Sequence, residues 1–252
     1  MTIAIIGAGR VGGALASRSA EHGAPCPLIT RESGWEVLDA GAGAPILVAV
    51  RNDDLAVVFE RVPEHRRRDL VLVQNGMLRP WIAERGLDDV TRGLLFFAVP
   101  KRGAAVEPGG VSPFSGPHAA AVVAWLSALG LPAEVADPLS FAELELEKLI
   151  WNCAFGLLCQ VHDAPVGAVV EVHGRELRAV VAEMAHVGAV AMGTELELDP
   201  LLGRLCAYSR SIADYQGAVK EWRWRNGWFV DAAIEHGVAM PVHADLLRRA
   251  GL

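Results

Sequence analysis

Residues 2–23 read TIAIIGAGRVGGALASRSAEHG and join a short β-branched run, a glycine-rich turn and a helical pattern. The run at 2–6 is typical of a buried parallel strand, and the helical pattern ends at Gly23. Between them stands GxGxxG, whose glycines permit a tight turn, close approach of a pyrophosphate and close helix packing. The alternative is a plain strand-to-helix turn, but the context favours a dinucleotide site. The residues predicted to contact the dinucleotide there are Gly7, Ala8, Gly9, Arg10, Val11 and Gly12.

The end of the next predicted strand, 25–30, bears on the choice of cofactor. A carboxylate at this position binds the ribose 2′-hydroxyl of NAD, whereas an arginine can hold a 2′-phosphate through its charge and forked hydrogen bonds. The first charged residue here is Arg31, with Glu32 directly after it. We therefore expect NADP, and NAD remains the alternative if the strand ends one residue later so that Glu32 binds the ribose.

Strand and helix patterns alternate over about 135 residues, which predicts a doubly wound, Rossmann-like α/β sheet. Arg51 and Asn75 follow two of the predicted strands, and ligands of such sheets bind beyond the carboxyl ends of the strands. We expect both side chains to lie over the cofactor, although Asn75-Gly76 also fits an ordinary turn. The run EHRRRD at 64–69 is interpreted as a solvated helix end. The remaining predicted strands are 45–50, 70–74, 94–99, 111–115 and 133–136, and the helices are 53–62, with an aspartate N-cap, and 118–129.

The composition limits the classes of function. The chain has 252 residues, 52% of them hydrophobic and 21% charged, which is typical of a well-packed globular protein. A net charge of −7 argues against a general nucleic-acid or anionic-membrane surface. No signal-peptide pattern or bilayer-length apolar run is found. The four cysteines lack CxxC spacing, so we expect buried reduced thiols and a cytoplasmic location.

Beyond residue 137 the strand signals stop and helical periodicity continues to the end of the chain. We expect two domains, a dinucleotide-binding domain at 1–137 and an all-α domain at 138–252 that forms the other wall of a cleft. The predicted helices are 140–161, 174–194, 199–218, 220–237 and 241–250. Lys148 and Asn152 lie one turn apart in the first of them and share a face. They fit either a snorkelling lysine with a core asparagine or a proton donor whose pKa burial has lowered.

Three segments together resemble the ketopantoate reductase (2-dehydropantoate 2-reductase) family. The first is the GxGxxG turn with Arg31 after the next strand, accompanied by Gln74-Asn75-Gly76-Met77 and by Arg51, where the family usually carries a lysine. The second is AELELEKLIWNC at 142–153. The third is Glu221 followed by Asn226-Gly227 and HGVAMPVH at 236–243. The second and third segments are specific, whereas the first is common to many dinucleotide-binding enzymes.

The resemblance implies an NADPH-dependent reductase of a small 2-keto acid, acting in pantothenate biosynthesis if the substrate is ketopantoate. It implies that Lys148 protonates the keto oxygen, that Asn152 binds that oxygen, and that Glu221 bonds the substrate or orients Lys148. Asn75 would lie between nicotinamide and substrate. The spacing to the family's carboxylate-binding serine points to Ser209, with Ser211 as the alternative. The implied partner is a small-molecule keto acid, without nucleic acid or membrane, and a homodimer is left open.

Three segments depart from the family pattern, and the first departure puts ketopantoate in doubt as the substrate. Gly156 replaces a second asparagine that helps to hold the hydroxyl-bearing end of ketopantoate in the family. The segment after Gly93 reads LLFFAVPKRG and lacks the family's threonines. The segment EWRWRNGW at 221–228 fits either packing by its tryptophans or a reshaped pocket in which Arg223 or Arg225 meets an anionic group.

Other classes of function remain open at this point. A β-hydroxyacid or 6-phosphogluconate type dehydrogenase also combines such a sheet with a helical domain and a Lys/Asn pair. A dinucleotide-binding regulatory protein without catalysis would fit the departures. Metal chemistry is not expected, because the histidines lack metal-binding spacing. The histidines considered are His162, His173, His186, His236 and His243.

Overall fold

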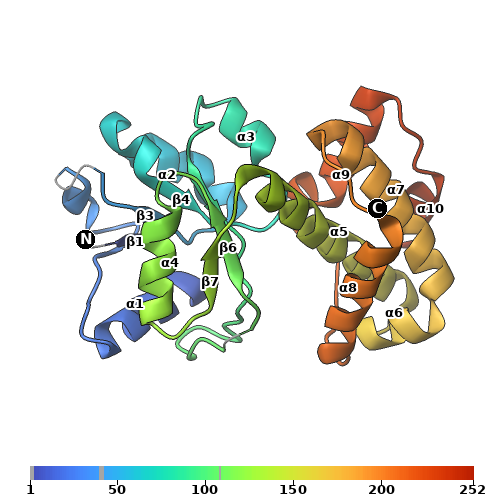
Figure 1. Ribbon diagram of the computed structural model, residues 1–252, viewed down its shortest axis with the longest axis horizontal. Helices are drawn as coiled ribbons and strands as arrows, with labels where there is room; N and C mark the ends of the chain where they lie inside the picture. Colours follow the sequence, from blue (N-terminus) through green and yellow to red (C-terminus); the bar gives the residue numbers. More distant parts are fainter. Residues whose placement is uncertain (1–2, 40–42, 108) are drawn as a thin grey trace. The chain divides into compact units, whose positions relative to one another are not determined.

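The computed structural model describes residues 3–39, 43–107 and 109–252. The chain divides into two compact units, Met1–Phe141 and Ala142–Leu252. The first unit holds a seven-stranded sheet, and the second is helical (Figure 1). The predicted fold class, a Rossmann-like α/β unit followed by an all-α unit, is confirmed.

The sheet has the strand order β2-β1-β3-β4-β5-β6-β7. The first five strands in this order run parallel, β6 runs antiparallel to β5, and β7 is parallel to β6. The carboxyl ends of β1, β3 and β4 therefore lie side by side on one edge, where such sheets bind ligands. The strands are β1 (Ala4–Ile6), β2 (Leu28–Ile29), β3 (Ile46–Val48), β4 (Leu70–Leu72), β5 (Thr91–Gly93), β6 (Ser112–Ser115) and β7 (Ala133–Val135).

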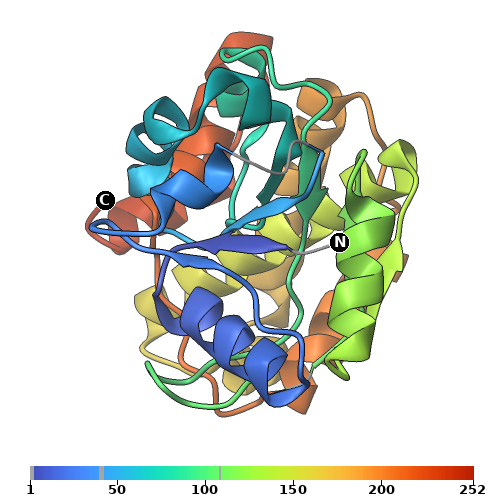
Figure 2. The same cartoon turned by 90° about the vertical axis from the view of Figure 1, so that its left-hand side faces the viewer.

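Helices cover both faces of this sheet. Because side chains alternate along a strand, Ile3 and Ile5 join the core beneath α1 and α4, together with Phe114. Figure 2 shows α1 on one side of the central strands and the segment that carries α2 and α3 on the other. The helices are α1 (Arg10–Glu21), α2 (Leu55–Arg61), α3 (Arg79–Ala83) and α4 (Ala119–Ala128), with 3-10 turns η1 (Trp35–Leu38), η2 (Asn52–Asp54) and η3 (Glu64–Asp69).

Two predicted elements of this unit differ in detail. The strand expected at 94–99 is wrong, since the paired residues are Thr91–Gly93. A Cβ at Gly93 would lie 2.1 Å from the ring of Phe114, so the glycine lets the strand approach β6 closely. Of the expected stretch, Ala98 forms an isolated bridge with Glu107. The aspartate expected to cap residues 53–62 makes no side-chain cap bond, because η2 occupies that first turn.

The run at 64–69 is not a solvated helix end, because Arg66 is buried. Its Nε donates to Asp69 at 2.5 Å, and its two terminal nitrogens donate to the carbonyls of Leu38 and Ala44. Asp69 also bonds the ring of His118 at 3.1 Å. Burial of a guanidinium is tolerated where its donors are satisfied, a compensation that periodicity does not reveal.

The second unit packs around α5 (Pro138–His162), which begins just before the unit boundary. Asp137 caps its start by accepting bonds from the backbone of Leu139 and Ser140, and Pro138 suits the first helical position. The expected helices at 199–218 and 220–237 are shorter in the structure, and α6 was not predicted. The other helices are α6 (Val166–Val172), α7 (Gly174–Met192), α8 (Leu198–Ser211), α9 (Asn226–His236) and α10 (Pro241–Arg249), with the 3-10 turn η4 (Trp222–Trp224).

The apolar residues of α5 form part of the core of this unit. No single helix among the described residues is long and apolar enough to cross a membrane, and α5 passes that test only when paired with α6, at an angle of 82°. Nine of its residues from Leu146 to Cys159 are among the most buried of the chain: Leu146, Leu149, Ile150, Cys153, Ala154, Phe155, Leu157, Leu158 and Cys159.

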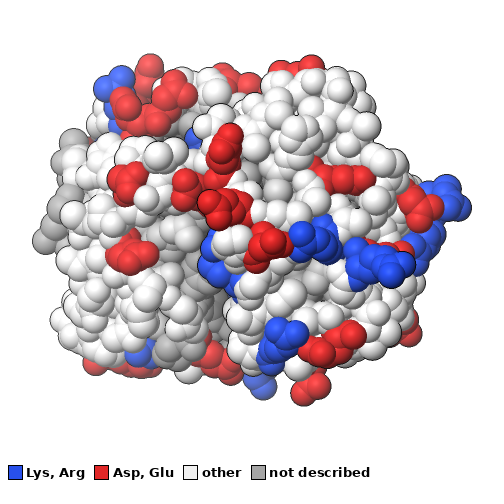
Figure 3. Space-filling model, turned by 45° about the vertical axis from the view of Figure 1, so that its right-hand side comes forward, with Lys and Arg blue, Asp and Glu red and all other residues white. Residues whose placement is uncertain are grey.

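The burial of the cysteines agrees only in part with the expectation. All four cysteines are free; Cys153 and Cys159 are buried as expected, whereas Cys26 and Cys206 are half-buried. On the face drawn in Figure 3, acidic and basic side chains lie beside one another among uncharged residues.

Candidate functional site

The glycine-rich turn joins β1 to α1 at the carboxyl edge of the sheet, and two of its glycines are required by the fold itself. Gly7 has a φ of +108° and lies so close to β3 that a Cβ there would be 2.8 Å from the carbonyl oxygen of Ala49. A Cβ at Gly12 would lie 1.9 Å from the carbonyl oxygen of Gly7. These contacts bring α1 tightly against the first strand, as the motif predicts.

Gly9 differs from its two partners. A Cβ at this position would meet only the carbonyl oxygen of Ala49 at 3.9 Å, so the protein's own packing does not demand a glycine. Gly9 stands directly before α1, whose first backbone N–H groups have no partner within the helix. Missing side-chain bulk at the start of a helix leaves room for an anionic group to reach those donors. The residues present therefore fit a dinucleotide pyrophosphate.

Arg31 extends into solvent beyond β2. Its side chain is 83% exposed and meets Asp54 at 3.5 Å. The neighbouring Thr30 accepts bonds from the backbone of Glu32 and Ser33, and its hydroxyl donates to the Glu32 carboxylate at 3.1 Å. The turn thus holds the Glu32 carboxylate locally and leaves the Arg31 guanidinium available to a phosphate.

Asn75 is exposed at the end of the β4 segment, where the sequence predicted it, and Arg51 is exposed at the end of the β3 segment. Two neighbours that the sequence analysis gave no role position this edge. Gln74 donates from its amide to the carbonyls of Val48 and Val50, at 2.7 and 3.2 Å. Asn52 donates to the backbone carbonyl of Asn75 at 2.8 Å. Their polarity beside apolar strands is the signal that could have identified them.

Lys148 and Asn152 lie on one face of α5, as their spacing predicts. The amide nitrogen of Asn152 donates to the carbonyl of Lys148 at 2.8 Å, and its second hydrogen is not used by that bond. The pKa of Lys148 is lowered to about 7, first by burial and then by the positive charge of Arg225. A lysine with such a pKa exchanges a proton readily near neutral pH.

Glu221 pairs with Arg225, one turn further along the chain. The carboxylate lies 2.6 Å from the Arg225 guanidinium, whose side chain is 10% exposed. Glu221 adopts a left-handed backbone conformation with φ of 49°, which is uncommon outside glycine and concentrates at functional sites. Among the described residues, the Nε of Arg225 is buried without a hydrogen-bond acceptor. Arg225 is thus the buried arginine of this segment, and Arg223 is exposed.

Ser209, expected to meet a substrate carboxylate, is fully buried. Its hydroxyl donates to the carbonyl of Leu205 at 2.9 Å and accepts the indole N–H of Trp151 at 3.0 Å. The alternative, Ser211, is exposed and donates to the carbonyl of Tyr208 at 2.7 Å. Both hydroxyls are engaged within the protein, so the geometry favours structural roles for both serines.

A pocket opens beside Asn152 within the helical unit. It encloses about 250 Å³, including its solvent-open mouth. Its lining joins one face of α5, the start of α6, the segment before η4, and Arg225. The residues are Trp151, Asn152, Phe155, Gly156, Val166, Tyr215, Gly217, Ala218, Lys220 and Arg225.

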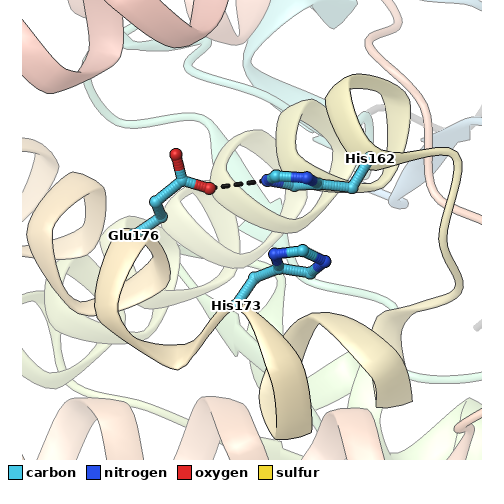
Figure 4. A group of neighbouring side chains, drawn as sticks. All are labelled: His162, His173 and Glu176. Carbon is cyan, nitrogen blue, oxygen red and sulfur yellow. Dashed lines mark hydrogen bonds and ion pairs between the residues drawn. The ribbon is translucent and has the colours of Figure 1, made fainter.

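A second polar cluster lies at the far end of α5, where no metal-binding spacing was recognised. His162, His173 and Glu176 place their potential ligand atoms within 4.8 Å of one another (Figure 4). His162 bonds Glu176 at 2.6 Å, and the two imidazoles stack with centroids 3.6 Å apart. Arg249 donates a hydrogen bond to the other carboxylate oxygen of Glu176 at 2.5 Å and holds the pKa of this carboxyl below its usual range. Glu176 thus connects His162, at the end of α5, with Arg249 of α10.

Comparison with known proteins gives a family match over most of the helical unit. Residues 140–250 match the family model described as ketopantoate reductase PanE/ApbA, C terminal. A search of the curated proteins finds no match.

Solved structures share the fold over nearly the whole chain. A D-mandelate dehydrogenase in complex with NADH aligns with a TM-score of 0.77 at 18% identity, over 100% of this chain and 98% of that one. A PanE/ApbA family ketopantoate reductase from Ralstonia eutropha JMP134 gives 0.77 at 21%, over 99% and 97%. The dimeric ketopantoate reductase of Staphylococcus aureus gives 0.76 at 16%, over 100% and 99%.

Proposed function

We propose, on the premise that residues 140–250 belong to the ketopantoate reductase PanE/ApbA C-terminal family, that the protein is an NADPH-dependent reductase of a small 2-keto acid. The relatives of similar fold include ketopantoate reductases and a mandelate dehydrogenase with NADH, which supports an oxidoreductase of 2-oxo acids. The family match also favours this activity over that of a β-hydroxyacid or 6-phosphogluconate type dehydrogenase.

The observation that carries the proposal is the placement of Lys148 and Asn152 on one face of α5, where Asn152 donates to the Lys148 carbonyl at 2.8 Å. Burial and the positive charge of Arg225 lower the pKa of Lys148 to about 7, which suits a proton donor near neutral pH. In the proposed reaction, the Lys148 ammonium gives a proton to the keto oxygen as that oxygen gains negative charge. Asn152 offers an amide hydrogen one helical turn away and thereby orients the carbonyl. Glu221 fixes Arg225 through its ion pair.

The chain's own residues support a dinucleotide cofactor. Bound nicotinamide dinucleotide supplies the hydride that reduces the keto carbon. The space at Gly9 and the donors at the start of α1 would hold the pyrophosphate. The exposed Arg31 guanidinium would hold a 2′-phosphate, which favours NADP over NAD. Arg51 and Asn75 stand at the same edge of the sheet, where we expect contacts with the cofactor or with the substrate's reacting end.

The cellular location, the oligomeric state and the pathway are proposed from other observations. The four free cysteines support a reducing, cytoplasmic environment. A homodimer is proposed by analogy with the dimeric Staphylococcus aureus relative. Pantothenate biosynthesis would follow only if ketopantoate is the substrate.

The test is a dinucleotide-oxidation screen over 2-keto acids, followed at 340 nm with NADPH and NADH in parallel. We expect reduction of at least one 2-keto acid, with NADPH preferred. Tight NADPH binding without turnover of any acid would instead support a regulatory, dinucleotide-binding protein. Direct binding of NADPH, measured by fluorescence, distinguishes that outcome from failure of the cofactor assignment.

A further inference from the structure

The pocket beside Asn152 is closed at the position where a third polar side chain on the same helix face would stand. Gly156 follows Lys148 and Asn152 at intervals of four residues, so all three share one face. A Cβ at Gly156 would lie 2.7 Å from the carbonyl oxygen of Ala218 and 3.2 Å from its carbon. The oxygen is the nearer atom, so this carbonyl points toward the helix. Backbone therefore fills the place of a polar side chain.

The rest of this wall is aromatic. Trp151 stacks on Phe155 with centroids 5.8 Å apart and an interplanar angle of 26°. Tyr215 lies 6.1 Å from Trp151 at 33°. The indole N–H of Trp151 is occupied by Ser209, so the polar group of this ring is already bonded within the protein. Such a wall favours a flat or branched apolar group and gives a hydroxyl little compensation for lost water.

Arg225 supplies a positive charge to this pocket. Its side chain is 10% exposed, and one terminal nitrogen holds Glu221 at 2.6 Å. Its buried Nε has no acceptor among the described residues, an arrangement that disfavours the empty site and is relieved by a ligand oxygen. Lys220 also lines the pocket and Lys148 is near enough for Arg225 to affect its ionisation. The local charges therefore favour an anion.

We propose that this pocket binds a 2-oxo acid whose side chain is apolar or aromatic, with Arg225 holding the carboxylate and Trp151, Phe155 and Tyr215 the side chain. The assignment rests on the proposed reductase function and names its substrate class. Gly156 and Ala218 provide no side-chain donor to a hydroxyl on the substrate's side chain.

The substrate test uses a matched pair of acids. Ketopantoate and 3,3-dimethyl-2-oxobutanoate differ only by a hydroxyl, and phenylglyoxylate supplies a flat aromatic group. We expect kcat/KM for the latter two to exceed that for ketopantoate at least tenfold. Preference for ketopantoate would overturn the substrate class while leaving the reductase function intact.

The carboxylate test uses binding, so it does not depend on turnover. We expect quenching of tryptophan fluorescence by phenylglyoxylate, with affinity at least 30-fold weaker in Arg225→Met. The neutral methyl ester is the control, since a purely structural effect would weaken acid and ester equally. The double variant Glu221→Gln/Arg225→Met removes the ion pair without leaving the Glu221 carboxylate unpaired, and circular dichroism checks its fold. Equal loss for acid and ester in both variants would overturn the role of Arg225.

The side-chain wall is tested at Tyr215, which is 46% exposed and can be replaced with little risk to the core. Tyr215→Ser should weaken phenylglyoxylate several-fold and leave pyruvate, which lacks a bulky side chain, nearly unchanged. Equal effects on both acids would reject the wall. If acids bind in this pattern but none is reduced, the binding site stands and the reductase function fails, so the two failures are distinguishable.

Discussion

The positive charge of Arg225 acts on Lys148, and both residues lie in the helical unit. Burial is the main cause that lowers the pKa of Lys148 to about 7, and the positive charge of Arg225 lowers it further. Glu221 neutralises one side of the Arg225 guanidinium at 2.6 Å. The charge near the proposed proton donor is therefore set by a residue that also lines the pocket.

This linkage predicts the pH profile of reduction. A general acid acts in its protonated form, so kcat/KM should be level below pH 7 and fall about tenfold per pH unit above the pKa. Arg225→Met removes a positive charge, and the pKa of Lys148 should rise, which moves the falling limb to higher pH. Initial rates from pH 5.5 to 9.5 measure this shift. A limb that stays in place would reject the linkage.

Replacement of Lys148 tests the proton donor directly. Lys148→Ala should lower turnover by about 10²–10⁴-fold, the usual contribution of a general acid. NADPH affinity should remain near that of the wild type, because the glycine-rich turn lies in the other unit. Lys101→Ala, which removes an exposed lysine, is the control. Unchanged turnover in Lys148→Ala would contradict the mechanism.

The glycine-rich turn offers a pair of substitutions that separate folding from binding. Gly12→Ala would bring a methyl group within 1.9 Å of the Gly7 carbonyl, so we expect loss of stability or of soluble protein. Gly9→Ala meets only an ordinary contact at 3.9 Å. We expect its melting temperature to stay close to the wild type while NADPH affinity falls at least tenfold. Intact NADPH binding in Gly9→Ala would argue against pyrophosphate binding at this turn.

Periodicity and motif context predicted the sheet unit, the helical unit and the shared face of Lys148 and Asn152. They did not predict Arg66 in a buried network, because its compensation comes from the carbonyls of Leu38 and Ala44 and from Asp69. Leu38 and Ala44 are distant from Arg66 in the sequence, and the path of the backbone decides whether their carbonyls face it.

The same dependence on tertiary packing explains which parts of the candidate site the sequence did not predict. Spacing pointed to Ser209, but whether a hydroxyl faces a pocket or the core depends on the helix rotation that packs α8 against Trp151. His162, His173 and Glu176 come together because the chain turns on both sides of α6. Their spacing in the sequence does not match a recognised metal-binding pattern. The sequence left Arg223 and Arg225 as alternatives for contact with an anionic group, and Arg225 is the buried one of the two.

Arg31 is predicted to decide between NADPH and NADH. The guanidinium is 83% exposed and only loosely paired with Asp54, so it can meet a 2′-phosphate. Arg31→Ala should weaken NADPH at least tenfold and leave NADH nearly unchanged. Arg68→Ala, at another exposed arginine, is the control for net charge. Equal losses for both cofactors would reject the 2′-phosphate contact.

The buried side chain of His243 is expected to make the free energy of unfolding depend on pH. Its ring is almost fully buried, and its Nε2 and the Asn226 side-chain oxygen are 3.0 Å apart. Burial lowers its pKa from 6.5 to about 4. Between these values the unfolded chain binds more protons than the folded one, so the free energy of unfolding falls as pH decreases from 6.5 toward 4.

The loss should reach roughly 3 kcal/mol once the pH is below both pKa values. Urea unfolding at pH 7.5, 6, 5 and 4 measures it. His243→Gln keeps a hydrogen-bond donor for Asn226 but does not titrate, so its stability should vary less over this range. His236→Gln removes an exposed histidine and should leave the wild-type dependence unchanged. If His243→Gln loses stability as steeply as the wild type, other groups cause the acid sensitivity.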